Sequence, residues 1–99
     1  MTYTVDGLME QILSALPESY MIKSREDALI KSAFTTEELG EVVKAIARGD
    51  RKEVVKECAD TIVGILQIMT YYNDEGTQGV ASAFDETLRK LRERKTANG

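Results

Sequence analysis

Carboxylate side chains in the middle of the chain have a spacing that suits metal chemistry. Glu37, Glu38 and Glu41 fall close together, and Glu57 and Asp60 follow after an intervening Gly-Asp pair. Like charges one helical turn apart repel each other by roughly 0.2–0.5 kcal/mol per pair. These acids therefore need either full solvation or a cation among them.

The residues around the acids predict a helical hairpin. Gly49 is typical of the left-handed residue that ends a helix, and Asp50 with Glu53 has the form of a capping box that begins the next helix. Apolar residues recur at helical spacing on both sides of this turn. We therefore predict helices over 25–48 and 51–73, joined by a tight connection.

Polar residues set the start and the continuity of the first of these two helices. Ser24 with Asp27 has the form of a capping box, which places the start just after Ser24. Thr35 with Glu38 has a similar form, so a second helix could begin there. We favour one continuous helix, because the apolar face runs through both halves.

Two further helices complete an all-α prediction with a single domain over 1–99. The first covers 6–16, with Asp6 as its expected cap and Pro17 as its end. The last covers 79–95 and is marked by Val80, Phe84, Leu88 and Leu91. A polar, glycine-containing loop over 73–79 precedes it, and a polar tail over 96–99 follows it.

In such a hairpin the acids of the two helices lie side by side. Glu41 is about eight residues, or roughly 12 Å, before the turn, and Glu57 is about seven residues, or roughly 10–11 Å, beyond it. Glu38 and Glu41 stand three residues apart in the first helix and share a face. Glu57 and Asp60 have the same spacing in the second helix and also share a face. Packed helix axes are about 8–10 Å apart, so four carboxylates can surround one point. Oxygen-only ligands select a hard cation, with Mg²⁺ as the expected occupant and Mn²⁺ as a substitute.

Composition restricts the classes of function. The chain has 99 residues, a formal net charge of −4 and 42% hydrophobic residues, which favours a packed globule and disfavours nucleic-acid binding. It contains no histidine, which excludes histidine-based nucleophile activation and histidine metal ligands. A single cysteine, no signal peptide and no long apolar run predict a soluble, cytoplasmic protein without membrane association.

A non-catalytic interpretation of the acids stays open. Surface helices commonly carry glutamates on their solvated face, so the chain is also compatible with a helical interaction module. Against this, Glu57 and Asp60 lie on a narrow polar stripe of an otherwise apolar helix. The hairpin aligns that stripe with Glu38 and Glu41.

The paired acidic motif resembles a known family. The runs Glu37-Glu38-Leu39-Gly40-Glu41 and Glu57-Cys58-Ala59-Asp60 match the E-E-x-x-E and E-x-x-D motifs of the MazG-like all-α nucleoside triphosphate pyrophosphohydrolases, over about residues 25–95. The resemblance implies a short four-helix subunit that uses Mg²⁺ to cleave a (d)NTP into monophosphate and pyrophosphate, in a house-cleaning role. It also implies the metal ligands Glu38, Glu41, Glu57 and Asp60, with Glu37 orienting or deprotonating the attacking water.

Contacts to the nucleotide are predicted at three further residues. Phe34 lies one turn before Glu38 on the same face and is a candidate for stacking on the base, and Lys56 is a candidate for a substrate phosphate. C-terminal helices of many family members carry a K-x-x-x-N-x-x-R pattern that contacts phosphates. Here only Arg94 matches that pattern, so the resemblance is weakest at the phosphate contacts.

A second enzyme of the same superfamily is the nearest alternative. Phosphoribosyl-ATP pyrophosphohydrolase of histidine biosynthesis has a similar layout of acidic motifs. It ranks lower because the lysine-glycine context that precedes its first motif is replaced here by Ala33-Phe34-Thr35-Thr36.

Apolar residues cover most of the circumference of the 51–73 helix, which predicts that it is buried on most sides. Four short helices cannot cover it fully. We therefore predict a homodimer, or a tetramer built as a dimer of dimers, with this helix near the interface.

Overall fold

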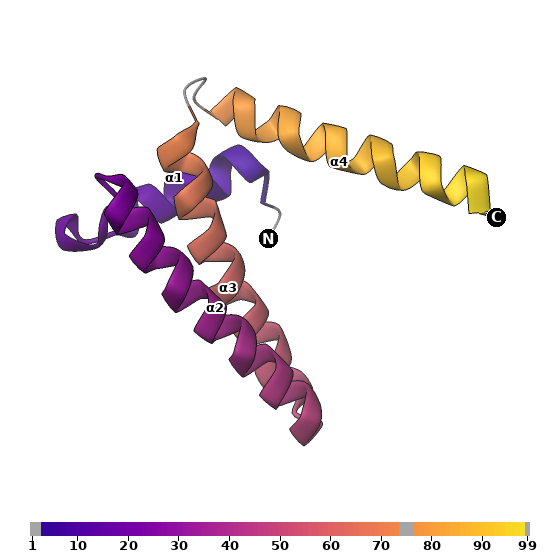
Figure 1. Ribbon diagram of the computed structural model, residues 1–99, viewed down its shortest axis with the longest axis horizontal. Coiled ribbons are helices and arrows are strands. Elements are labelled where there is room, and N and C mark those ends of the chain that lie inside the picture. Colours follow the sequence, from indigo (N-terminus) through magenta and orange to yellow (C-terminus); the bar gives the residue numbers. More distant parts are fainter. Residues whose placement is uncertain (1–2, 74–76, 99) are drawn as a thin grey trace.

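Four α-helices and one short 3₁₀ helix form the part of the chain that the computed structural model describes, residues 3–73 and 77–98 (Figure 1). In chain order they are α1 (Val5–Ala15), η1 (Glu18–Tyr20), α2 (Arg25–Arg48), α3 (Arg51–Tyr72) and α4 (Thr77–Asn98). No strand occurs within the described residues. The predicted all-α class is confirmed.

The ends of α1 differ from the prediction by one residue each. Thr4, and not Asp6, is the cap: its hydroxyl oxygen accepts a hydrogen bond of 2.9 Å from the Gly7 N–H. Leu16, predicted as the last helical residue, is extended with φ −72° and ψ 129°. The following Pro17 explains this, since a proline disfavours the helical conformation of the residue before it.

The last helix is longer than predicted at both ends. It begins at Thr77, within the predicted 73–79 loop, of which residues 74–76 lie outside the described part of the chain. It also continues through residues 96–98, where the prediction had a polar tail. The Thr96 hydroxyl donates a 3.1 Å hydrogen bond to the Arg92 carbonyl, and residues 80–98 contain no glycine or proline that would end the helix earlier.

One continuous helix, α2, covers the segment whose continuity was in question. Ser24 caps it by accepting a 3.1 Å hydrogen bond from the Asp27 N–H. The Thr35 and Thr36 hydroxyls each donate a 2.8 Å hydrogen bond to a carbonyl one turn earlier, on Lys31 and Ser32. Both threonines are therefore accommodated inside the helix.

A tight turn joins α2 to α3. Gly49 is left-handed, with φ 72° and ψ 22°, a conformation that glycine adopts without steric cost. The Asp50 N–H donates to the Ala45 carbonyl at 3.1 Å, and the Asp50 carboxylate accepts from the Glu53 N–H at 3.1 Å. The first contact satisfies a carbonyl at the end of α2, and the second an N–H at the start of α3. The two helices consequently run antiparallel, side by side (Figure 1). α3 ends at Tyr72, one residue before the predicted end.

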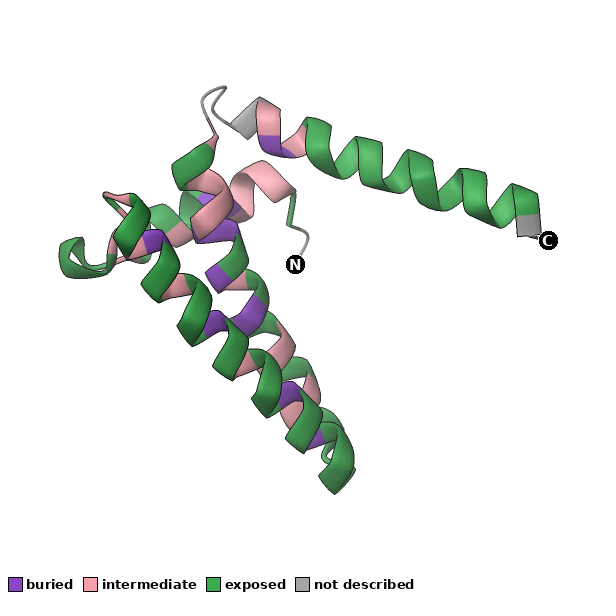
Figure 2. Ribbon diagram, in the orientation of Figure 1, coloured by how far each residue is buried: buried purple, intermediate pink, exposed green. Residues whose placement is uncertain are grey.

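Small residues allow α2 and α3 to approach closely. A Cβ placed on Gly64 of α3 would lie only 2.5 Å from the Thr35 hydroxyl oxygen of α2. Both residues are buried, and purple segments in Figure 2 mark the facing sides of the two helices. Gly64 and Thr35 therefore lie opposite each other and fix the register of the hairpin.

The main apolar core lies at the other end of the hairpin from the turn. Met9, Leu66 and Val80 form it, so that α1, α3 and the start of α4 meet there. Beyond this point α4 runs away from the hairpin and is exposed along most of its length (Figures 1 and 2). The radius of gyration is 15.5 Å, whereas about 13 Å is expected for a compact chain of this length.

Within one subunit, α3 is not buried on most sides, so the burial of its remaining sides by a second copy stays a prediction. Val55 and Ile62 are 71% and 51% exposed. Thr61 and Gly64, on the face toward α2, are instead buried. The polar stripe of α3 thus faces its neighbouring helix while much of its apolar surface is exposed. Within the described residues, no helix is both long enough and apolar enough to cross a bilayer.

Candidate active site

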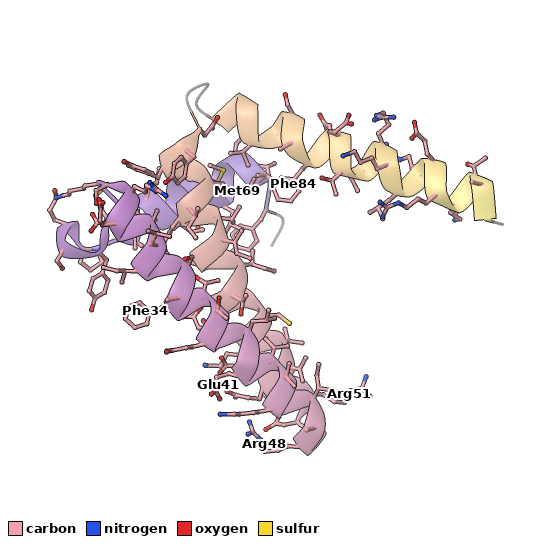
Figure 3. The ribbon with its side chains drawn as sticks, viewed as in Figure 1. Phe34, Glu41, Arg48, Arg51, Met69 and Phe84 are labelled. Carbon is pink, nitrogen blue, oxygen red and sulfur yellow. The ribbon has the colours of Figure 1, made fainter. Side chains whose placement is uncertain are left out.

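The first acidic motif lines a hollow on the surface of α2. Glu37, Glu38 and Glu41 border it, and its volume is about 530 Å³. The remaining lining residues are Tyr20, Lys31 and Phe34. Glu38 is half-buried toward α3, while Glu37 and Glu41 are exposed. Figure 3 shows Phe34 and Glu41 projecting from the same side of α2.

The second acidic motif lies at the same level of the hairpin. Counting back from the Thr35–Gly64 contact, Asp60 is level with Leu39 of α2, and Glu57 is level with Val42. At a rise of 1.5 Å per residue, the backbones that carry the four predicted metal ligands therefore lie within about 6 Å along the hairpin axis. The Glu57 side chain is only 13% exposed, and that of Asp60 is 50% exposed.

Lysine ammonium groups occupy the positions next to these carboxylates. The Lys56 Nζ lies 3.3 Å from a Glu57 oxygen, 3.4 Å from an Asp60 oxygen and 3.9 Å from a Glu53 oxygen. On α2, the Lys44 Nζ lies 3.2 Å from a Glu41 oxygen. Two carboxylates of the second motif therefore already converge on a single cation.

The pKa values of two α3 carboxyl groups reflect the same crowding of negative charge. A hydrogen bond between the Glu53 and Glu57 carboxyl groups raises the pKa of Glu53 and lowers the pKa of Glu57. Lys56 lowers the pKa of Glu57 further by hydrogen bonding, and its own pKa is raised by its bonds to Glu57 and Asp60. Of Glu53 and Glu57, Glu57 is therefore the carboxylate that more readily stays ionised.

The structure aligns the two motifs but does not gather their oxygens at one point. Among the described residues, no three carboxylates are close enough together to hold one metal ion. The side chains of Glu41, Glu57 and Asp60 bond instead to the lysines that flank them. Placing Glu38, Glu41, Glu57 and Asp60 around one ion thus requires side-chain rotation, and the ligand set stays a prediction.

The oxygen donors present nevertheless suit a hard divalent cation. Glu57 and Asp60 converge on the Lys56 ammonium, so their backbone positions already allow both carboxylates to contact one positive charge. Glu38 faces the same seam between the helices as Glu57, and both are half-buried. Carboxylate oxygens at such a seam, in a chain that contains no histidine, are ligands typical of Mg²⁺ sites.

The three predicted substrate contacts fall in different places. Phe34 lies in the acid-lined hollow, and Lys56 lies among the acids of α3. Arg94 is on α4, which packs against α1 and α3 but makes no packing contact with α2 among the described residues. Within a single subunit, the structure does not bring Arg94 to the hollow.

Two residues of the hollow were not predicted. Lys31 lies one turn before Phe34, and its i, i+3 spacing from Phe34 could have identified it. Tyr20 follows Pro17 in a segment without periodicity, so no spacing signal connects it to α2.

A comparison with protein families identifies the chain. The MazG nucleotide pyrophosphohydrolase domain matches residues 27–97, a segment that contains both acidic motifs, most of α2 and all of α3. No curated protein and no solved structure matches the chain significantly. Because the family match covers well over half of the sequence, the chain belongs to the MazG nucleotide pyrophosphohydrolase domain family.

Proposed function

We propose that the protein is a Mg²⁺-dependent nucleotide pyrophosphohydrolase that cleaves a nucleoside triphosphate or its deoxy form between the α- and β-phosphates. One observation carries the proposal beyond family membership. The three acids of the first motif share a hollow with Tyr20 and Phe34, and the acids of α3 lie level with them across the hairpin. Such a site offers carboxylates for a metal and aromatic groups for a nucleoside.

Glu38, Glu41, Glu57 and Asp60 are the residues that would hold the metal ion in this proposal. When bound, the ion supplies positive charge to neutralise the phosphates of the substrate, which is the main requirement of phosphoryl chemistry. Mn²⁺ would substitute for Mg²⁺ at the same oxygen ligands. If Glu57 and Asp60 turn to the ion, the Lys56 ammonium is released from them and becomes available to a phosphate oxygen.

Glu37 acts as the general base in the proposed reaction. It is exposed in the hollow beside Glu38 and Glu41, so its carboxylate can accept a proton from a water molecule in that space. The water oxygen forms a new bond to phosphorus as a phosphorus–oxygen bond of the α–β bridge breaks. The products are the nucleoside monophosphate and pyrophosphate.

An assay panel tests the activity and separates its alternatives. Purified protein is incubated with each canonical or damaged (d)NTP and with phosphoribosyl-ATP, with and without Mg²⁺. We expect Mg²⁺-dependent turnover of at least one (d)NTP, in keeping with a house-cleaning role. Exclusive turnover of phosphoribosyl-ATP would assign the protein to histidine biosynthesis. No turnover of any substrate would favour the interaction module.

Metal binding is expected to stabilise the folded protein. Mg²⁺ bound only by the folded form should raise the free energy of unfolding by about 2.7 kcal/mol at a hundredfold excess over its dissociation constant. Thermal melting in EDTA and in millimolar Mg²⁺ measures this change. The double variant Glu57→Gln, Asp60→Asn serves as the control and should lose the Mg²⁺-dependent shift. Superimposable melting curves of the wild-type protein, also with a nucleotide analogue present, would contradict the metal site.

We also propose that the protein assembles as a homodimer or tetramer. Among the described residues, large apolar side chains are exposed on α2, α3 and α4, including Val43, Val55, Ile62 and Leu91. Large exposed apolar surface on a soluble protein often marks a protein–protein contact. A second copy would cover them, and it could bring Arg94 of its own α4 to the hollow.

The assembly is expected to depend on the exposed apolar face of α3. Sedimentation velocity at tens of micromolar should give a dimer or larger species, and the double variant Ile62→Glu, Ile65→Glu should shift it to monomer. Lys52→Glu changes the charge at an exposed polar position of the same helix and should leave the assembly intact. A compact wild-type monomer at this concentration would exclude the proposed assembly.

A further inference from the structure

We infer that a second hollow, between η1 and the first half of α2, binds the nucleobase of the substrate, and that Tyr20 and Phe34 hold the base there. This inference rests on the proposed function and extends it to the recognition of the nucleoside.

The two hollows adjoin each other along α2. The second has a volume of about 170 Å³, and three of its lining residues, Tyr20, Lys31 and Phe34, also line the acid-lined hollow. Its other lining residues are Ser19, Met21, Ile22, Asp27 and Ile30. From Ile30 to Glu41 the helix rises about 16 Å, at 1.5 Å per residue. A nucleotide can therefore lie along α2 with its phosphates at the acids and its base between η1 and α2.

Both aromatic residues are available for stacking. Tyr20 is 64% exposed and Phe34 is 56% exposed, so neither ring is used in the core of the subunit. They come from different elements, η1 and α2, and border the same space. Stacking of a base on an aromatic side chain is worth about 1–3 kcal/mol and tolerates different bases.

The segment that carries Tyr20 is held in place by local hydrogen bonds. The Tyr20 N–H donates to the Pro17 carbonyl at 2.9 Å, which closes the 3₁₀ turn. The Lys23 N–H donates to the Asp27 carboxylate at 3.0 Å, and the Lys23 Nζ bonds to a Glu18 oxygen at 2.7 Å. These bonds join both ends of the segment to one another and to α2. The wall that Tyr20 forms is consequently present before a nucleotide binds.

Lys31 lies where the two hollows meet. Unlike Lys23, Lys44 and Lys56, its ammonium makes no ion pair within residues 3–73 and 77–98. A lysine at this boundary provides a charge for the phosphate nearest the sugar. From the start of α2 toward the acids, the lining side chains are apolar at Ile30, basic at Lys31 and aromatic at Phe34. The apolar and aromatic groups thus lie on the side of η1 and the carboxylates lie farther along the helix, in the order of the base and the metal-bound phosphates of a nucleotide.

The test measures the Michaelis constant of the preferred nucleotide in two variants, Phe34→Ala and Tyr20→Ala. Each should raise KM by about 5- to 150-fold, the range that corresponds to the loss of one stacking contact, with kcat little changed. Inhibition by inorganic pyrophosphate, which has no base, should keep its wild-type inhibition constant in both variants. Phe34→Tyr retains an aromatic ring and should keep a KM close to that of the wild type.

Phe84→Ala is the matched control, because Phe84 is an exposed phenylalanine on α4 that lines neither hollow (Figure 3). Its KM should equal that of the wild type. An active wild-type enzyme whose KM is unchanged by both Phe34→Ala and Tyr20→Ala would overturn this inference alone. A parallel loss of pyrophosphate inhibition in those variants would also overturn it, because the variants would then act on the phosphate site. Absence of turnover in the wild type would instead refute the proposed function, and the inference with it.

Discussion

The Glu37→Gln variant is expected to lose turnover by about 10²- to 10⁴-fold, the usual contribution of a general base. Glu37 lines the same hollow as Glu38 and Glu41, but it is exposed and points about 100° around the helix from Glu38. Its carboxylate therefore reaches the edge of the proposed metal site instead of its centre. The glutamine side chain has almost the same shape but cannot accept the proton. The fold and most of the affinity for the Mg²⁺–nucleotide complex should be retained.

Variants at the predicted ligands provide the contrast. Glu38→Gln and Glu57→Gln each remove a negative charge from the half-buried seam, so Mg²⁺ affinity and activity should fall together. Steady-state kinetics and calorimetric titration with Mg²⁺ and a non-hydrolysable nucleotide separate the two patterns. Full activity of Glu37→Gln would remove Glu37 from the mechanism. A collapse of its metal affinity would move Glu37 into the ligand set.

The Gly64→Ala variant is expected to lower the free energy of unfolding by about 1–3 kcal/mol, as overpacking of a close contact usually does. The new Cβ would lie 2.5 Å from the Thr35 hydroxyl oxygen, a distance at which the two helices must separate or Thr35 must move. Because this contact sets the register of the hairpin, activity should fall as well. Thermal melting at a fixed protein concentration measures the stability, since the proposed assembly would make melting depend on concentration.

A matched glycine in α2 serves as the control for this prediction. A Cβ on Gly40 would meet nothing within 4 Å, so Gly40→Ala should stabilise the protein by about 0.5–1 kcal/mol through helix propensity alone. Replacing Thr35 by alanine as well should restore much of the stability lost in Gly64→Ala. If Gly64→Ala is as stable as Gly40→Ala, the helices do not approach as closely as described.

The hairpin could be predicted from sequence because local interactions define it. Gly49 adopts the left-handed conformation, Asp50 caps α3, and Ser24 caps α2, each by bonds within a few residues. The start of the first helix was harder to predict from sequence, because Thr4 and Asp6 are both residue types that cap helices. Only the structure shows that the Thr4 hydroxyl accepts the hydrogen bond from the Gly7 N–H. The parts of the fold that could be predicted are therefore those that hydrogen bonds between neighbouring residues define.

The candidate site could be predicted only in part, because it depends on contacts between distant segments. The motif spacing aligned the acids along the hairpin, but it could not give the Thr35–Gly64 contact that brings the polar stripe of α3 toward α2. It also could not place Tyr20, which reaches the hollow through the fold of the segment after Pro17. The rotamers of the acids depend on the cations beside them, and here Lys56 provides that charge to Glu57 and Asp60.

The identity of the reaction products tests the central proposal most directly. Phosphorus NMR of a (d)NTP incubated with the wild-type protein and Mg²⁺ should show the nucleoside monophosphate and pyrophosphate appearing in equal amounts. Addition of EDTA should stop the reaction, and Glu57→Gln should give little product. Release of orthophosphate with a nucleoside diphosphate, or no Mg²⁺-dependent product from any nucleotide in the panel, would contradict a pyrophosphohydrolase built on these carboxylates.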